Sequence, residues 1–360
     1  MILFGREKAV LVGIELPQEK LFLSELARLA ETAGALVVEK FSQKRPHPDP
    51  KYFIGSGKLE ELQAVVSRKG ADLVIFDHEL RASQQRNLED VLKVKVVDRT
   101  ELILDIFARH ARSREGKLQV EMAQTSFRLT RLTGHGVQMS RLGGGIGTRG
   151  PGETKLEVDR RAIRSRLAFL KTELEKIRKE RMIKREKRRH GETKSAAIVG
   201  YTNSGKSTLF NSLTRAGVLV EDKLFATLDP VIRRLYLPSG RFVLLTDTVG
   251  FIQKLPHQLV SSFRATLEEV SDADLLLHVV DISAADFESQ ISSVYNVLEE
   301  LNSITKPMLT VLNKTDQAIP EIIEAAKKKY DPACAVSALE KKGLEQLLSK
   351  VDDLLPGPPA

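Results

Sequence analysis

The chain has 360 residues, of which 42% are hydrophobic and 29% charged, and its formal net charge is +8 at pH 7. The length predicts more than one domain, and the composition excludes disordered and fibrous chains. The excess of Lys and Arg favours a polyanionic partner, nucleic acid before an anionic membrane, although solubility alone also explains a charge of this size.

Cys334 is the only cysteine, so no internal disulfide is expected. The 7 histidines are scattered, without the paired spacing of metal ligands. No apolar run approaches the ~18 residues that a membrane span needs, and the N-terminus lacks a cleavable signal pattern. We expect a cytoplasmic protein with no membrane partner, and partial membrane association is the alternative location.

The first hundred residues alternate between β-branched apolar runs and amphipathic helical patterns. The predicted strands and helices are, in chain order, 8–16, 19–33, 34–41, 58–69, 71–77 and 94–99. This alternation predicts an α/β domain over residues 1–110, with a parallel sheet and crossover helices. The segment YFIGSGKLE lacks the first glycine and the Ser or Thr of a phosphate loop, so we interpret it as a turn that opens a helix; a phosphate or RNA contact is the less favoured reading.

Helical periodicity continues over 101–132 and again from Glu153 to about His190, on either side of the glycine-rich segment LGGGIGTRGPGET. We predict a long helical hairpin over residues 111–194. The glycines and nearby basic residues suggest backbone and guanidinium contacts to RNA phosphates, while a flexible linker and a solvated charged helix are the alternatives. The candidate RNA contacts are Gly143, Gly144, Gly145, Gly147, Arg149, Gly150, Lys184, Arg185 and Arg188.

A second α/β domain is predicted over residues 195–356, with a mostly parallel sheet and flanking helices. Its expected strands are 195–201, 241–248, 274–282, 308–314 and 333–338. The first of them leads into GYTNSGKST and then a helical pattern, the strand, loop and helix order of a phosphate loop. Backbone N–H groups of this loop would surround a β-phosphate, Lys206 would bridge the terminal phosphates, and Ser207 would offer its hydroxyl to Mg²⁺.

Two further segments predict a switch that responds to a γ-phosphate. Asp247 of DTVG follows an apolar strand, where it can hold Mg²⁺ through water, and Gly250 can present its N–H to the γ-phosphate. Thr227 of FATLDP can add a second hydroxyl to the metal when triphosphate is bound. We therefore predict a Mg²⁺ site formed by Ser207, Thr227 and Asp247, and assign Lys206, Thr227 and Gly250 to catalysis.

The segment NKTD, at the end of an apolar strand, identifies the base as guanine. The Asp316 carboxylate can accept hydrogen bonds from the N1–H and the exocyclic amine of guanine, whereas adenine has no such donor pair. The Lys314 stem would pack on the ring, Asn313 would brace the loops, and SAL would present a backbone N–H to the guanine O6. The predicted GTP-binding residues are Gly200, Tyr201, Thr202, Asn203, Ser204, Gly205, Lys206, Ser207, Thr208, Phe225, Ala226, Thr227, Leu228, Asp229, Asp247, Thr248, Val249, Gly250, Asn313, Lys314, Thr315, Asp316, Ser337, Ala338 and Leu339.

The order of these motifs resembles translation-factor-class GTPases of the Obg–HflX group. The segments GFIQKLPHQLVSSFRATLEEV after DTVG and GGGIGTRGPGETKLEVDRR upstream are similar to the HflX family, and the resemblance covers nearly the full length. It implies a ribosome-associated GTPase whose N-terminal region reaches RNA of the large ribosomal subunit and which splits or recycles stalled or idle ribosomes under stress. We expect a monomer, although no sequence feature gives the oligomeric state. Family members have also been assigned ATP hydrolysis, but no motif here selects adenine.

One position limits the expected mechanism. Phe251 follows Gly250 where many GTPases place a glutamine that orients the attacking water, so we expect slow intrinsic turnover that ribosomes stimulate. Two other classes remain open: a non-enzymatic RNA-binding or antiassociation module, and an RNA-modification GTPase, which would need a cofactor domain that residues 1–195 do not suggest.

Overall fold

The computed structural model describes residues 7–17, 23–133, 155–189, 193–214, 224–225, 227–253 and 264–355. The chain forms two compact units. One comprises residues 1–109 and 117–174, and the other comprises residues 110–116 and 175–360. The two helices of the predicted hairpin are thus divided between the units, and a separate domain over 111–194 stays a prediction.

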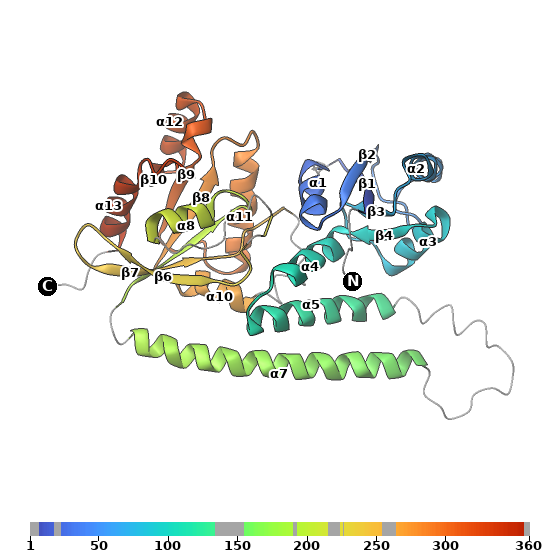
Figure 1. Ribbon diagram of the computed structural model, residues 1–360, viewed down its shortest axis with the longest axis horizontal. Helices are drawn as coiled ribbons and strands as arrows, with labels where there is room; N and C mark the ends of the chain where they lie inside the picture. Colours follow the sequence, from blue (N-terminus) through green and yellow to red (C-terminus); the bar gives the residue numbers. More distant parts are fainter. Residues whose placement is uncertain are drawn as a thin grey trace. The chain divides into compact units, whose positions relative to one another are not determined.

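The first unit contains the expected parallel sheet. Its four strands have the order β2-β1-β3-β4, and every neighbouring pair is parallel. The strands are β1 Lys8–Glu15, β2 Leu36–Lys44, β3 Leu73–Phe76 and β4 Lys95–Asp98. The helices that connect and follow them are α1 Leu23–Thr32, α2 Ser56–Lys69, α3 Ala82–Leu92 and α4 Arg99–His110. Figure 1 shows α1 on one side of this sheet and α2 and α3 on the other.

Alternation along the strands explains how the sheet buries both faces. Val10, Val12 and Ile14 of β1 point to one face and pack in a cluster with Leu62 of α2 and Leu88 of α3. The intervening residues of β1 are buried as well, as expected for a sheet that helices cover on both sides. The YFIGSGKLE segment forms the turn that opens α2, where the Gly55 N–H donates to Gln43 Oε1 at 2.9 Å.

The helix expected over 101–132 is in fact two helices, α4 and α5 (Arg114–Thr133), which is a correction to the sequence prediction. Ser113 explains the interruption. Its hydroxyl accepts the Gly116 N–H at 2.8 Å, so Ser113 caps α5 at its N-terminus. Serine before a helical pattern is a recognised start signal, which the continuous leucine and isoleucine periodicity concealed.

Helix α5 packs directly against α7 (Lys155–Arg189). Sequence alone left open whether the two helices pair. Within the first unit, Arg166 Nε donates to Glu121 Oε1 at 2.7 Å and Leu170 is fully buried. Figure 1 shows the two helices side by side. The predicted RNA contacts Gly143, Gly144, Gly145, Gly147, Arg149 and Gly150 lie outside the described residues, as do the side chains of Lys184, Arg185 and Arg188.

The second unit contains a six-stranded sheet with the order β10-β9-β8-β5-β7-β6. Its strands are β5 Ser195–Gly200, β6 Val231–Tyr236, β7 Phe242–Asp247, β8 Leu275–Asp281, β9 Met308–Asn313 and β10 Ala333–Ala335. Its helices are α8 Lys206–Thr214, α10 Arg264–Asp272, α11 Phe287–Glu300, α12 Pro320–Lys329 and α13 Leu344–Leu354, with a 3₁₀ turn at Thr315–Gln317. All neighbouring strands are parallel except the β6–β7 hairpin, and β6 was not predicted.

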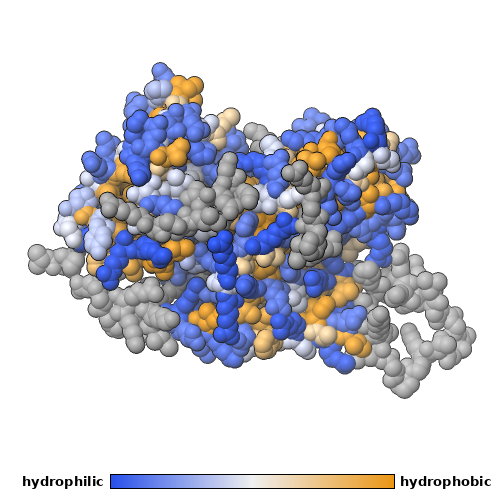
Figure 2. Space-filling view, viewed as in Figure 1, coloured by the Kyte–Doolittle hydropathy of each residue, from blue (hydrophilic) through white to orange (hydrophobic). Residues whose placement is uncertain are grey.

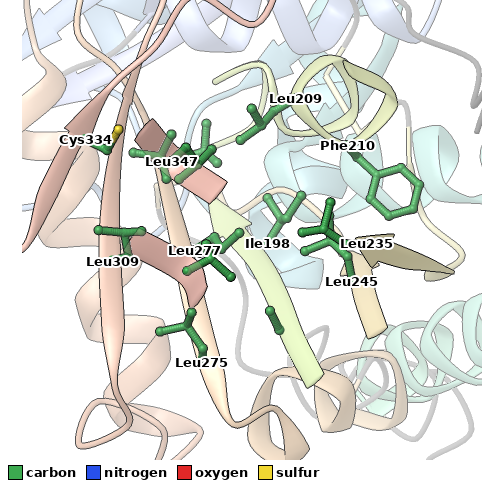
Figure 3. Packing of buried hydrophobic residues seen from close by; sticks show 14 of the residues in the cluster. Ile198, Leu209, Phe210, Leu235, Leu245, Leu275, Leu277, Leu309, Cys334 and Leu347 are labelled. Atoms are coloured by element: carbon green, nitrogen blue, oxygen red, sulfur yellow. The ribbon is translucent and has the colours of Figure 1, made fainter. Parts of the chain in front are cut away.

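Both faces of this sheet are covered by helices. On one face, Leu209 and Phe210 of α8 and Leu347 of α13 pack against Ile198 and Leu277 of the central strands (Figure 3). On the other face, Ile291 of α11 and Ala326 of α12 pack against strand residues. This burial fixes β5 and the start of α8, between which the phosphate loop lies.

The surface is mixed in character. Figure 2 shows hydrophobic side chains in small separate groups between hydrophilic ones on the face in view. Among the described residues, no helix is long and apolar enough to span a bilayer.

Candidate nucleotide site

The loop between β5 and α8 is held in the conformation that phosphate binding requires. Gly200 and Gly205 have φ of +153° and +90°. A Cβ at Gly200 would overlap the Val279 carbonyl oxygen, and one at Gly205 would overlap Asn313 Nδ2. Only glycine therefore fits either position, and the loop leads directly into the N-terminus of α8, where backbone N–H groups favour an anion.

Lys206 is buried at the first position of α8. Its Nζ donates to the Tyr201 carbonyl oxygen at 2.6 Å. Burial lowers the pKa of Lys206 to about 8, against the opposing attraction of Asp247. A Cβ added at Gly250 would lie 2.9 Å from Lys206 Nζ and 2.8 Å from Thr202 Cα, so the DTVG glycine backbone is in contact with the phosphate loop.

The three residues predicted to hold Mg²⁺ lie together. Ser207 Oγ donates to Asp247 Oδ2 at 2.7 Å, and the Thr227 hydroxyl lies 2.9 Å from Ser207 Oγ and 3.3 Å from the same carboxylate oxygen. Asp247 is fully buried, which raises its carboxyl pKa, while the bond from Ser207 opposes this shift.

This cluster fits a hard divalent cation. Asp247 Oδ1 is buried and has no hydrogen-bond partner among the described residues. An orphaned carboxylate oxygen beside two hydroxyls supplies the oxygen donors that Mg²⁺ prefers, with water completing the coordination. Ser207, Thr227 and Asp247 would hold the ion, Asp247 through water.

Phe251 belongs to the framework of the site and not to its reacting surface. Its N–H donates to the Gly200 carbonyl at 3.1 Å, and its own carbonyl accepts the Thr202 N–H at 2.7 Å. Phe251 is 1% exposed. Thr202 also holds the neighbouring segment, since its hydroxyl accepts the Phe225 N–H at 3.1 Å. The residue after Gly250 therefore ties the DTVG segment to the phosphate loop and cannot orient a water molecule.

Residues of NKTD and SAL, which are predicted to bind the base, lie in contact with one another. Asn313 Nδ2 donates to the Ser204 carbonyl at 2.9 Å, and its Oδ1 accepts the Ala338 N–H at 3.0 Å. Asp316 is exposed and accepts a hydrogen bond from Ser337 Oγ at 2.6 Å, which lowers the carboxyl pKa of Asp316. The carboxylate is therefore ionised at neutral pH and available to two donors.

Lys314 shows a contact that sequence reasoning missed. Its Nζ lies 2.6 Å from Asp281 Oδ2, at the end of β8. The ion pair anchors the amine, so the stem is held near the base site. An acidic residue at the carboxyl end of a parallel strand was the available signal.

Other predicted residues have varied surroundings. Asn203 adopts φ +62° in the loop, the Thr248 hydroxyl donates to the Ile198 carbonyl at 2.5 Å, and Leu339 is 74% exposed. Ala226 lies outside the described residues. The Asp229 carboxylate accepts hydrogen bonds from the backbone N–H groups of Arg112 and Ser113 and from the Ser113 hydroxyl, and its role in GTP binding stays a prediction.

Three family models match successive parts of the chain. Residues 21–108 match the model described as GTP-binding GTPase N-terminal, and residues 110–188 match the GTP-binding GTPase middle region. Residues 195–314 match the model described as 50S ribosome-binding GTPase.

Similar proteins match nearly the whole chain. GTPase HflX of Caldanaerobacter subterraneus subsp. tengcongensis is 53% identical over 96% of this chain and 80% of its own length. GTPase HflX of Escherichia coli is 43% identical over 98% of this chain and 83% of its own length. A crystal structure of SsGBP in complex with GDP has a TM-score of 0.52 and 28% identity, and covers 97% of this chain and 98% of that one. The chain belongs to the HflX family of P-loop GTPases.

Proposed function

We propose that this GTPase binds the large ribosomal subunit in a nucleotide-dependent manner, uses Mg²⁺, and splits or recycles stalled or idle ribosomes under stress. The observation that carries the proposal is the match of residues 195–314 to a ribosome-binding GTPase model, over the unit that holds the assembled nucleotide site. The net charge of +8 supports an RNA partner. A cytoplasmic monomer is part of the same proposal.

The residues of the site have separable tasks in GTP hydrolysis. Lys206 would neutralise charge on the β- and γ-phosphates, and the Gly250 N–H would donate to the γ-phosphate. Asp316 would select guanine. Mg²⁺, when bound by Ser207, Thr227 and Asp247, supplies charge stabilisation to the phosphate oxygens.

The buried Phe251 ring supports slow turnover by the isolated protein, because no glutamine stands at that position to orient water. We expect large ribosomal subunits to raise the GTPase rate, through a group or a rearrangement that they contribute. Equal rates with and without large subunits would remove the stimulation from the proposal.

Sedimentation tests the partner directly. The protein would be centrifuged with small subunits, large subunits or intact ribosomes, in GDP or in a non-hydrolysable GTP analogue. We expect co-sedimentation with large subunits in the analogue, and loss of it in Lys206→Ala. The control Lys328→Ala changes an exposed residue of α12 and should behave like wild type. Failure to follow large subunits in either nucleotide would overturn the ribosomal proposal.

Light scattering of intact ribosomes distinguishes ribosome splitting from binding that leaves the ribosome intact. A GTP-dependent fall in scattering supports splitting, and binding without such a fall contradicts it. A non-enzymatic antiassociation module is the rival reading, and it predicts no turnover even with subunits present. An RNA-modification GTPase would instead alter the RNA covalently.

A further inference from the structure

Asp229 stands two residues after Thr227 and makes three contacts with one short segment. Its Oδ2 accepts the N–H groups of Arg112 at 3.0 Å and Ser113 at 2.8 Å, and its Oδ1 accepts a hydrogen bond from the Ser113 hydroxyl. The Ser113 hydroxyl in turn accepts the Gly116 N–H. Asp229 therefore completes the N-terminal cap of α5 with a charged acceptor.

The residues on both sides of this contact belong to one compact unit, which includes residues 110–116. On the other side of Asp229, Leu228 is 2% exposed and the Thr227 hydroxyl faces Ser207 and Asp247. Only one residue separates Thr227 from Asp229, and that residue is buried. The short buried connection gives a direct path by which a backbone shift at Asp229 would reach Thr227.

The same end of α5 has a second attachment within this unit. Glu115 in its first turn pairs with Arg181 of α7 at 2.7 Å. Arg181 also lies 4.0 Å from Glu269 of α10, and Arg178 pairs with Glu268 at 3.0 Å. The first turn of α5 is thus fixed independently of Asp229, so it can act as a firm support for the segment that carries Thr227.

We propose that Asp229 is a positioning residue: by capping α5 it holds the Thr227 hydroxyl beside Ser207 and Asp247, and so couples GTP and Mg²⁺ binding to the start of α5. This inference rests on the proposed role of Thr227 in holding Mg²⁺ with the triphosphate. Coupling of this kind is reciprocal, since GTP binding must then also tighten the cap.

Gly116 offers a substitution that attacks the contact without weakening the helix. A Cβ at Gly116 would overlap Asp229 Oδ1 and lie 3.2 Å from Ser113 Oγ. Alanine is a better helix former than glycine, so a loss of affinity in Gly116→Ala arises from displacement of the Asp229 carboxylate and the Ser113 hydroxyl, the two groups that form the contact. Gly57→Ala is the matched control, because it also lies in the first turn of a helix and its Cβ would meet nothing within 4 Å.

The measurement is the affinity for a non-hydrolysable GTP analogue and for GDP, both with Mg²⁺. We expect Gly116→Ala, Asp229→Ala and Ser113→Ala each to lose about tenfold in affinity for the analogue while GDP affinity changes less than about twofold. Ser113→Thr, which keeps the hydroxyl, should restore wild-type affinity. Equal affinity for the analogue in wild type and Gly116→Ala would overturn the proposal, and so would an equal loss for both nucleotides.

Hydrogen exchange gives a readout that a purely structural role would not move. The analogue should slow exchange at the amides of Arg112, Ser113 and Gly116 relative to GDP in wild type, and this difference should vanish in Asp229→Ala. Persistence of the difference in that variant contradicts the coupling. If wild type bound neither nucleotide, the proposed site itself would fail, a result distinct from either outcome above.

Discussion

The Asn313 side chain donates a hydrogen bond from Nδ2 to the carbonyl oxygen of Ser204, 2.9 Å away. The same amide accepts the Ala338 N–H, so one side chain joins the phosphate loop to the SAL loop. The predicted phosphate site and the predicted base site therefore share one bracing side chain.

Asn313→Ala removes this brace. Loss of two buried hydrogen bonds at about 1 kcal/mol each predicts GTP affinity lower by about thirtyfold, provided that both loops relax. Isothermal titration calorimetry measures the change, with exposed Asn296→Ala on α11 as the control. Unchanged affinity in Asn313→Ala would show that the two loops hold their positions without it.

Asp316→Asn tests the choice of base. The amide of asparagine presents a donor to the donors of guanine, so we expect GTP affinity to fall by about a hundredfold. The affinity of the variant for ATP should equal that of wild type. Asp353→Asn, at an exposed position of α13, is the control for the same chemical change. The prediction fails if wild type binds GTP and ATP equally well.

Lys206 should make nucleotide affinity depend on pH. Burial lowers the pKa of Lys206 to about 8. Bound phosphates would attract the ammonium and raise that pKa, so binding takes up a proton above pH 8 and affinity falls as pH rises. The limiting slope is about tenfold per pH unit. GDP affinity measured from pH 7 to 9 should show this fall in wild type, whereas Lys206→Met should bind weakly with no step near pH 8.

His278 predicts a pH dependence of stability. Burial, with a smaller contribution from the charge of Lys206, lowers the pKa of His278 to about 3. Unfolding exposes an imidazole of ordinary pKa, so below pH 6.5 the unfolded state binds a proton that the folded state does not. The free energy of unfolding therefore decreases as the pH is lowered. The loss between pH 7.5 and 5.5 is about 1.4 kcal/mol.

Denaturant unfolding of wild type and His278→Phe at the two pH values isolates this contribution. The variant keeps a ring beside Tyr295, whose centroid lies 5.4 Å from that of His278. We expect the free energy of unfolding to depend less on pH in the variant, and exposed His47→Phe to behave like wild type. Identical pH dependence in all three proteins would contradict the prediction.

Much of the fold follows from local pattern. Most predicted strands lie within a few residues of their positions because short continuous apolar runs such as LVIF and LLLHVV, rich in β-branched residues, favour strands of a sheet that helices cover on both faces. Strand β6 was missed because Arg233 and Arg234 interrupt its apolar character, as an edge strand tolerates. The PSG turn before β7 was the signal that could have revealed the hairpin.

The nucleotide site could be anticipated as a set of residues but not as a set of contacts. The spacing of GYTNSGKST, DTVG and NKTD indicated which side chains would meet, since each follows a strand of one sheet. The pairing of Lys314 with Asp281 and of Asp229 with Ser113 joins residues that no pattern links, because the partners lie 33 and 116 positions apart. Such contacts arise from tertiary packing alone.

The β6–β7 hairpin limits how far Thr227 can travel. Val231 is in register with Asp247, so the ladder begins only a few positions beyond that threonine. Any withdrawal of its hydroxyl must be taken up by the four Cα–Cα steps from Thr227 to Val231, which span roughly 14 Å when fully extended, unless β6 separates from β7. The pairing of β6 with β7 therefore confines Thr227 to a limited volume around the Asp247 carboxylate.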